Sequence, residues 1–325
     1  MKNILITGGA GFIGSNFVNT ICTREDLLAE NRFIILDALT YAGRKENIDK
    51  AIFDHKNIEF VQGDIRDDQK IAEVFSHYQF DGVLNFAAES HVDRSIENPN
   101  IFFETNALGT LNLLKESLIR FEENNEFRYM QISTDEVYGQ LGMNDPAFTE
   151  QTPIAPSSPY SSSKASADLM VNAFHHTYGL PTVISRCSNN YGPLQFPEKL
   201  IPVMILKALK SEALPVYGDG SNIRDWIHVH DHNEGVWKIF TEGKNGEAYN
   251  LGGNREVSNL DLVKMILDIM DRPHSLISFV TDRLGHDFRY AMNIEKIERE
   301  LGWKPKVDFE TGLKNTVEHF VSIFQ

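Results

Sequence analysis

The sequence predicts an α/β fold in which a doubly wound parallel sheet is joined by a second, smaller C-terminal domain. Two observations lead to this prediction. Short, continuously apolar runs alternate with amphipathic helical patterns over roughly the first 190 residues, as is typical of parallel strands covered by helices on both faces. Beyond that point the elements shorten, and proline, glycine and charged residues become more frequent.

The expected strands and helices follow one another in order along the first part of the chain. Apolar residues recur at three- and four-residue spacing in the helical segments; Asn98 and Pro99 precede one helix and Gly179 closes another. The expected strands span 2–7, 32–37, 58–64, 81–88, 127–134 and 181–189. The expected helices span 12–22, 71–78, 98–121 and 160–178.

The chain is expected to cross between its two domains more than once. The first domain should comprise residues 1–189 and a return at about 224–252, where "IHVHDHNEGVWKIF" and "EAYNLGG" look like further parts of the sheet domain. The second domain should comprise about 190–223 and 253–325.

Composition and charge restrict the class of protein. The chain has 325 residues, of which 42% are hydrophobic and 24% charged, and no stretch approaches the length of a membrane span. A net charge of −15 argues against nucleic-acid binding, so an anionic ligand must be held by local positive groups or helix N-termini. The N-terminus leads directly into a strand, which leaves no room for a signal peptide. Cys22 and Cys187 fit neither a disulfide framework nor a metal cluster, and we expect a cytoplasmic location.

Three glycines lie between the first strand and the first helix. In "TGGAGFIG", Gly8 suits a tight turn, Gly11 allows a pyrophosphate to approach the backbone, and Gly14 allows close packing of helix and strand. The spacing is G-x-x-G-x-x-G, and glycine-rich turns of this kind also occur for purely structural reasons. Their place between a strand and a helix favours a Rossmann-like dinucleotide site.

Two carboxylates end the next two strands. Asp37 is positioned to accept a hydrogen bond from a ribose 2′-hydroxyl and to repel a 2′-phosphate, which favours NAD over NADP. Arg44 follows it and is expected to be solvated. Asp64 either contacts the adenine edge or caps a turn, and the sequence does not separate these roles.

The segment "PYSSSK" places Tyr160 and Lys164 on one helix face, four residues apart. A lysine ammonium close to a phenol favours the phenolate and lowers its pKa, which would make Tyr160 a base toward a sugar hydroxyl. The Y-x-x-x-K pattern is weak alone, but it is specific when it follows a glycine-rich strand–helix unit. Tyr138 is expected only to pack beside this site.

Asp135 and Glu136 stand side by side in "STDEVYG", at the end of an apolar strand. Repulsion and burial can separate their pKa values and leave one carboxyl protonated and the other ionised. An acid and a base beside a transient ketone are the groups that an elimination of water requires, with Glu136 as the base and Asp135 as the acid. The alternative is a solvated turn, or a cap formed by Asp135.

These motifs resemble the extended short-chain dehydrogenases/reductases, and the set as a whole resembles the dTDP-glucose 4,6-dehydratases from residue 4 to about 305. The resemblance is carried by "GGAGFIGSNF", "AAESHVDRSI", "TNALGT", "STDEVYG", "SPYSSSKASAD", "NNYGPLQFPEKLIP", "IRDW" and "DRLGHDFRYA". It implies NAD as a recycled cofactor and conversion of dTDP-glucose to dTDP-4-keto-6-deoxyglucose and water.

The resemblance also implies roles for individual residues. The catalytic set would be Thr134, Asp135, Glu136, Tyr160 and Lys164. Cofactor contacts would come from Gly8, Gly11, Phe12, Ile13, Gly14, Asp37, Asp64, Ile65, Ala87, Ala88, Glu89, Ser90, His91, Thr105, Tyr160, Lys164 and Asn190. Substrate contacts would come from His91, Thr134, Asn189, Lys199, Leu200, Pro215, Val216, Tyr217, Arg224, Asn259, Asp282, Arg283, Leu284, Gly285 and His286.

Some residues keep a second interpretation. Leu284 stands where the family usually has proline, and only a short loop follows the helix between the fourth and fifth strands. Arg224 suits a diphosphate, as arginine forks do, but it could instead pair with Asp225. His228, His230 and His232 alternate as metal ligands on a strand would, yet nearby cysteine ligands are absent and no metal is predicted.

Helices 98–121 and 160–178 carry apolar residues on more than one face, which favours a homodimer through these helices, as in the family; a covering C-terminal segment is the alternative. Two other functions share parts of this site. A nucleotide-sugar 4-epimerase needs no acid–base carboxylate pair, and a non-catalytic NAD sensor needs neither Tyr160 nor Lys164. The sequence does not decide whether the base of the nucleotide is thymine, uracil or cytosine. The single methyl group that distinguishes thymine from uracil contributes only about 1–3 kcal/mol to binding in a pocket.

Overall fold

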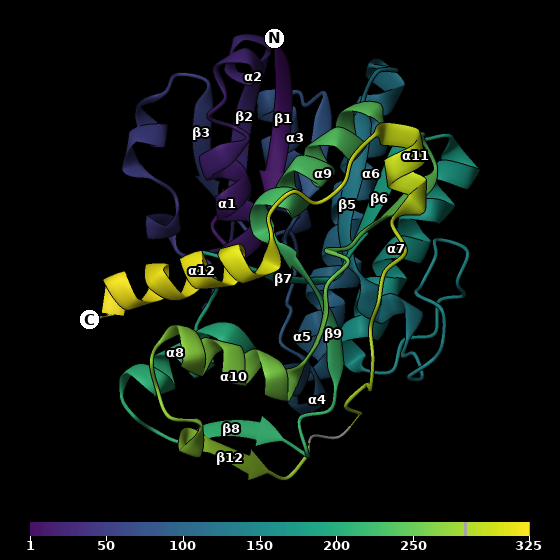
Figure 1. Ribbon diagram of the computed structural model, residues 1–325. Coiled ribbons are helices and arrows are strands. Elements are labelled where there is room, and N and C mark those ends of the chain that lie inside the picture. Colours follow the sequence, from purple (N-terminus) through teal and green to yellow (C-terminus); the bar gives the residue numbers. More distant parts are fainter. Residues whose placement is uncertain (283–284, 325) are drawn as a thin grey trace.

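The structure is a computed structural model that describes residues 1–282 and 285–324. Its centre is a parallel sheet in the order β10-β6-β5-β4-β1-β2-β3 (Figure 1). The strands are β1 (Lys2–Thr7), β2 (Asn31–Asp37), β3 (Ile58–Gln62), β4 (Gly82–Asn85), β5 (Arg128–Thr134), β6 (Thr182–Cys187) and β10 (Glu247–Leu251). Because β1 has β2 on one side and β4 on the other, the order reverses at β1, and a doubly wound sheet binds ligands beside such a reversal. The predicted fold class is confirmed.

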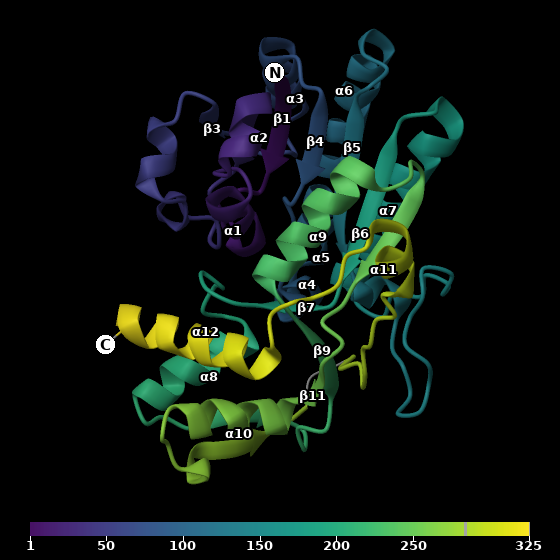
Figure 2. The same ribbon diagram turned by 45° about the horizontal axis from the view of Figure 1, so that its top comes forward.

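Alternating side chains of the strands supply two separate cores. Ile4 and Ile6 point to one face of the sheet, and Leu5 points to the other. The first face packs against α1 (Phe12–Thr20) and α9 (Val229–Glu242), and α9 crosses the sheet in both views (Figures 1 and 2). The second face is covered by α3 (Asp68–Tyr78), α6 (Thr110–Glu123) and α7 (Pro159–Tyr178). This burial explains why the strands read as continuous apolar runs.

The helix predicted over 98–121 is interrupted in its middle. Pro99 begins α5 (Pro99–Phe102), a π-helical segment η3 (Phe103–Gly109) follows, and α6 comes last. We call the continuous helical stretch α5–η3–α6 the helical rod. In η3 the buried Asn106 bonds both main-chain groups of Glu89 and the hydroxyl of Ser163. These contacts join segments far apart in the chain, so helical periodicity alone does not encode them.

A smaller unit follows the sheet domain and occupies the lower part of Figure 1. Its core is formed mainly by α8 (Leu200–Leu209), α10 (Asn259–Ile269) and α12 (Phe309–Phe324). Two small sheets support these helices, in the orders β11-β9-β7 and β12-β8. Their strands are β7 (Asn189–Tyr191), β8 (Leu214–Tyr217), β9 (Ile223–His228), β11 (Glu256–Ser258) and β12 (Ile277–Val280).

Late segments of the chain return to the sheet domain. Besides β10, the helix α11 (Glu295–Leu301) and Trp303 pack into the core beside α9. The sequence did not indicate the return of α11. The remaining short helices are α2 (Glu25–Glu30), α4 (Val92–Glu97), η1 (Lys45–Asn47), η2 (Lys50–Asp54), η4 (Asp135–Tyr138) and η5 (His274–Leu276).

In the ranges that the structure describes, no helix combines the length and the apolar character needed to cross a bilayer.

Candidate active site

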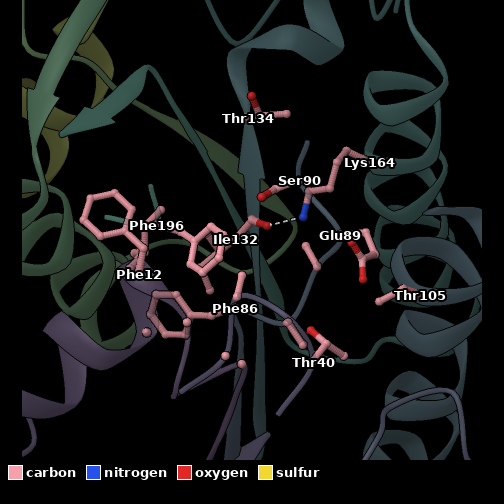
Figure 3. A pocket seen from close by; sticks show the side chains of 18 of the residues that line it. Phe12, Thr40, Phe86, Glu89, Ser90, Thr105, Ile132, Thr134, Lys164 and Phe196 are labelled. Carbon is pink, nitrogen blue, oxygen red and sulfur yellow. Dashed lines mark hydrogen bonds between the residues drawn. The ribbon is translucent and has the colours of Figure 1, made fainter. Parts of the chain in front are cut away.

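A cavity of about 310 Å³ opens at the carboxyl edge of the sheet, beside the reversal of strand order. Its walls come from the ends of β1, β2, β4, β5 and β6, from α7, and from the loop after β7. Figure 3 shows Phe12 and Phe86 on one side of this cavity and Lys164, Glu89 and Thr105 on the other. Most of the residues predicted to bind the cofactor line it.

The three glycines meet different steric limits. A Cβ on Gly8, whose φ is +68°, would lie 2.6 Å from the Ala87 nitrogen, and one on Gly14 would lie 2.2 Å from the Gly8 oxygen. A Cβ on Gly11 would meet only the Gly8 oxygen, at 3.4 Å. Gly8 and Gly14 are therefore required by the turn, whereas Gly11 leaves open space over the start of α1. Among the described residues no side chain caps this helix, so its first amides are available to an anion.

Asp37 ends β2 and lines the cavity. Its Oδ2 accepts a hydrogen bond from Ala10 N and its Oδ1 one from Leu39 N, each at 2.8 Å. Burial raises the pKa of Asp37, and the two backbone hydrogen bonds oppose the rise. The carboxylate thus holds the glycine turn against β2 and still faces the cavity, where a ribose hydroxyl could reach it.

Of the charged residues discussed with Asp37, Asp64 is paired with an arginine and Arg44 is exposed. Asp64 forms an ion pair with Arg66 at 2.6 Å and accepts the Arg66 main-chain N–H at 2.9 Å, so it caps a turn while it lines the cavity. Arg44 is exposed, as expected, and its guanidinium lies 5.1 Å from the centre of the Phe196 ring.

Tyr160 and Lys164 project from the first turns of α7 into the cavity. Ser158 caps this helix in a reciprocal arrangement with Ser161, and Pro159 occupies its first position, which fixes where the helix begins. Lys164 is 4% exposed, and its Nζ donates to the Ile132 carbonyl at 2.6 Å (Figure 3).

The expected lowering of the Tyr160 pKa is wrong for the protein alone. Burial raises the pKa of Tyr160 well above its ordinary value, and the negative charge of Glu136 adds to the rise. Burial also lowers the pKa of Lys164, although the nearby Asp168 carboxylate opposes this. Tyr160 and Lys164 both line the cavity, but desolvation rather than attraction to the lysine is the main influence on the pKa of Tyr160.

Asp135 and Glu136 both line the cavity, where β5 ends and the single turn η4 begins. Thr134 caps η4: its Oγ1 accepts from Glu136 N at 3.3 Å and donates to Asp135 Oδ1 at 3.1 Å. Asp135 is 2% exposed, whereas Glu136 is half-buried. Burial, then the charge of Glu136, raises the pKa of Asp135 well above its ordinary value. The two adjacent carboxyls therefore occupy unequal environments, and Thr134 rather than Asp135 forms the cap.

Several acceptor atoms around the cavity are buried and have no partner among the described residues. They are Asp135 Oδ2, Asn189 Oδ1, Asn190 Oδ1 and Gln195 Oε1. Leaving a buried polar atom unpaired costs about 1–3 kcal/mol, so such atoms suit a ligand that offers hydroxyl or amide donors. Together with the glycine cradle and Asp37, this set of acceptors fits a dinucleotide and a sugar.

The remaining predicted substrate residues form a second group beside the cavity. Arg224 is 5% exposed, donates to the Asp287 carbonyl at 2.9 Å, and lies 4.5 Å from the centre of the Tyr290 ring. Its positive charge lowers the pKa of Asp135, though burial outweighs it. Asp225 instead accepts the main-chain N–H of Arg255 at 2.8 Å.

The other members of that group come from β8, α10 and the loop after β12. His286 lies 2.6 Å from Asp282 and 6.2 Å, ring to ring, from Tyr217. Asn259, at the start of α10, donates its main-chain N–H to Asn222. Pro215 and Val216 lie in β8 and Gly285 follows the loop, but none of these residues lines the cavity itself. Arg283 and Leu284 lie outside the described residues.

Of Lys199, His91 and Leu200, only Lys199 lines the cavity. Lys199 lines the cavity, and its Nζ donates to the Ser90 carbonyl at 2.6 Å. His91 caps α4 and does not line the cavity, while Leu200 begins α8.

Sequence reasoning missed a contact between two loops beside the cavity, in which Tyr41 meets Phe196 and Glu198. We call this contact the Tyr41–Glu198 clasp. Tyr41, in the loop after β2, donates to Glu198 at 2.9 Å and packs edge-on against Phe196 at 5.5 Å. The guanidinium of Arg94 lies 3.7 Å from the centre of the Tyr41 ring. The aromatic and proline residues of "GPLQFPEK" were a signal for this loop, but its partner lies more than 150 residues away in the chain. Cys187 also lines the cavity and was not predicted to do so.

The three alternating histidines do not share a strand face. His228 ends β9 and caps α9, while His230 and His232 lie within α9. No group of three or more potential metal ligands occurs in the described part of the chain.

Comparisons with known proteins agree with this geometry. A family model described as GDP-mannose 4,6 dehydratase matches residues 5–316. The dTDP-glucose 4,6-dehydratase of Neisseria meningitidis serogroup B (strain ATCC BAA-335 / MC58) is 48% identical over 337 residues, covering 99% of this chain and 94% of the relative.

Two solved dTDP-glucose 4,6-dehydratases share the whole fold. The Bacillus anthracis (strain Ames) structure, in complex with NAD, has 46% identity and a TM-score of 0.89, and the match covers 99% of this chain and 97% of that one. The Streptomyces venezuelae structure, with NAD and TYD bound, has 43% identity and a TM-score of 0.93, covering 98% and 97%. The chain therefore belongs to the GDP-mannose 4,6 dehydratase family of extended short-chain dehydrogenases/reductases, and within it to the dTDP-glucose 4,6-dehydratases.

Proposed function

We propose that this protein is an NAD-dependent lyase that converts dTDP-glucose to dTDP-4-keto-6-deoxyglucose and water. The observation that carries the proposal is that two adjacent carboxyls in unequal environments face the cavity that also contains Tyr160 and Lys164. Oxidation of a hydroxyl requires only the tyrosine, the lysine and the cofactor. An additional acid and base are the groups that an elimination of water requires.

The chain's residues divide the reaction into an oxidation, an elimination and a reduction. The Tyr160 phenolate, stabilised by the ammonium of Lys164, takes the proton of the C4 hydroxyl and becomes the phenol. NAD held by the glycine cradle and Asp37 would supply the hydride acceptor for C4 and, once reduced, the hydride donor for C6. Because the ketone acidifies the C5 proton, the Glu136 carboxylate removes it while the Asp135 carboxylic acid protonates the departing C6 hydroxyl. Glu136 returns its proton to C5 when the hydride reaches C6. Thr134 keeps Asp135 oriented through its 3.1 Å hydrogen bond.

The raised pKa of Asp135 supports its role as the acid. A carboxyl at 2% exposure beside a second carboxylate favours its protonated form, and only that form can donate a proton at neutral pH. Glu136 is less buried and keeps access to the cavity, as a base must.

The substrate and its base are assigned from the relatives. The curated and solved relatives are named for dTDP-glucose, and they align along nearly the whole chain. A 4-epimerase would use Tyr160, Lys164 and NAD in the same way, but the buried Asp135 would have no role in its reaction. We assign the diphosphate to the side of the cavity where Arg224 and Lys199 lie.

Isotope transfer tests the reaction. With dTDP-glucose deuterated at C4, the product should be lighter by one water and should carry the label at C6. Label that is washed into solvent or retained at C4 would contradict an internal hydride return. Replacing the substrate by UDP-glucose or CDP-glucose in the same assay tests the choice of base.

We also propose that two copies associate through α7 and the helical rod that ends in α6. The support is that large apolar side chains remain exposed on this rod and on α7: Phe103, Leu108, Ile119, Leu169 and Tyr178. We further infer a cytoplasmic location, because the two cysteines are buried and unpaired, as is usual in a reducing compartment.

A further inference from the structure

A buried polar network lies directly behind the catalytic residues and takes no part in the reaction as written. Its centre is the guanidinium of Arg186, which donates to Asp168 Oδ2 at 2.9 Å and to the Tyr138 hydroxyl at 3.0 Å. The Tyr138 hydroxyl donates in turn to Asn250 Oδ1 at 2.8 Å. All four side chains are buried.

The network joins the elements that carry the two halves of the catalytic machinery. Asp168 lies one helical turn beyond Lys164 on α7, and Tyr138 is the last residue of η4, which begins with Asp135. Arg186 belongs to β6 and Asn250 to β10, so the network rests on two neighbouring strands of the rigid sheet. It therefore sets the distance between η4 and α7 without touching the cavity.

The turn η4 needs such an anchor. It is a single 3-10 turn of four residues, closed by Gly139 at φ +87°, and it has few backbone hydrogen bonds of its own. Two carboxyls occupy its first positions, and the cost of removing them from water favours a rearrangement that would take one of them to solvent. Thr134 holds the beginning of η4, and the Tyr138 side chain holds its end.

The ring of Tyr138 is also fixed by contacts, in addition to the hydrogen bonds of its hydroxyl. It stacks on Phe148 with a centroid distance of 5.1 Å, and the Arg186 guanidinium lies 4.9 Å from its centre. Val137, Leu141 and Ala165 complete the apolar cluster around it. Arg186 is neutralised by Asp168, so the network acts on the acid–base pair mainly by fixing its position.

We propose that Tyr138, anchored by Arg186 and Asn250, is a positioning residue for the elimination step: it holds Asp135 and Glu136 in place over the hexose while leaving the oxidation at C4 unaffected. This inference rests on the proposed dehydratase function. It gives a task to a tyrosine that the sequence suggested only as packing beside the site.

The test is Tyr138→Phe, which keeps the ring and its packing and removes only the hydroxyl. With dTDP-glucose, hydride transfer from C4 should continue while elimination slows roughly 10- to 100-fold, as expected when reacting groups are misplaced by a fraction of an ångström to an ångström. Reduced cofactor should therefore accumulate on the enzyme and be visible as absorbance at 340 nm. Exchange of the C5 proton with solvent should slow to the same extent.

The matched control is Tyr129→Phe, which removes another fully buried hydroxyl that bonds Asn85 and Gln131 in the same sheet. This control should lower the melting temperature similarly but should not accumulate reduced cofactor. Equal accumulation in both variants, or none in Tyr138→Phe, would overturn the positioning role. If the wild-type enzyme forms no dehydrated product, the proposed function fails instead, and the two failures are thus distinguishable.

Discussion

At the scale of single residues, Asp135 and Glu136 differ although they are neighbours in the chain. Asp135 is 2% exposed and accepts a hydrogen bond from the adjacent Thr134, whereas Glu136 is half-buried, and both line the cavity. The difference follows from η4, since successive residues of a tight turn point in different directions. Opposite protonation states can therefore coexist in adjacent residues.

Replacing the base should separate oxidation from elimination. In Glu136→Gln we expect cofactor reduction by dTDP-glucose to persist, because Tyr160 and Lys164 are untouched, while solvent exchange at C5 and product formation fall at least 100-fold. Asp135→Asn should retain C5 exchange and lose the departure of water. Proton exchange followed by NMR and absorbance at 340 nm measure the two steps. Undiminished turnover in Glu136→Gln would mean that another group is the base.

A second buried carboxyl makes stability depend on pH. Burial raises the pKa of Asp225 to about 6, above its ordinary value. Because the folded state then binds its proton more tightly than the unfolded state does, this contribution to stability is present below about pH 4 and is lost as the pH rises through about 6. In Asp225→Asn the carboxyl cannot titrate, so the free energy of unfolding should no longer show this decrease, which is up to about 3 kcal/mol in the wild type.

The measurement is the free energy of unfolding at several pH values between 4 and 7. The difference between wild type and Asp225→Asn should change over this interval, whereas the exposed Asp271→Asn should run parallel to wild type. Parallel curves for Asp225→Asn would show that its carboxyl is not titrating as described.

At the scale of elements, the turn between β1 and α1 contains two kinds of glycine. Gly8 and Gly14 are required by the fold, whereas Gly11 is required only by a ligand. Gly14 packs against Gly8, while Gly11 has φ −76°, which any residue adopts. In Gly14→Ala, the added Cβ would overlap the Gly8 oxygen and should destabilise the protein by about 3 kcal/mol. In Gly11→Ala, the fold should persist while the methyl group weakens NAD binding at least tenfold.

Melting temperature and NAD titration, measured on both variants, distinguish these effects. Gly11→Ala should melt close to wild type in the absence of cofactor and should gain less stability when NAD is added. Normal NAD affinity in Gly11→Ala would contradict the assignment of the cradle to the pyrophosphate.

At the scale of the whole molecule, the cavity is completed by segments from distant parts of the chain. The Lys199–Ser90 and Tyr41–Glu198 hydrogen bonds tie the loop after β7 to the sheet domain. Ser157, just before α7, donates to Asp287 at 2.6 Å and ties the catalytic helix to the segment that supports Arg224. Closing a site with such contacts excludes water from the reacting groups.

The proposed association should depend on the exposed apolar side chains of the helical faces. Leu169 is 55% exposed on α7, and Leu169→Arg should convert the dimer to a monomer by placing a charge in the interface. Met143→Arg, at a loop position that is 66% exposed, should leave the dimer intact. Sedimentation velocity measures both. A wild-type monomer, or a dimer that tolerates Leu169→Arg, would contradict the proposed face.

The sequence by itself predicted the strands β1 to β6 of the large sheet, the helical segments that contain α1, α3, α6 and α7, and the motifs of the site. Strand and helix signals are local, because burial on both faces makes parallel strands apolar and because caps such as Ser158 and Gly179 stand at helix ends. The glycine turn, Tyr160 with Lys164, and Asp135 with Glu136 are likewise contiguous motifs whose residues meet through local geometry alone.

Only the tertiary structure decided the electrostatic balance and the supporting contacts. Burial, which no short motif reveals, raises rather than lowers the pKa of Tyr160. The Arg186–Tyr138–Asn250 network and the Tyr41–Glu198 clasp join residues that are 48 to 157 positions apart. Desolvation and long-range pairing depend on which surfaces meet when the sheet, its helices and the smaller unit pack together, and that information is spread over the whole chain.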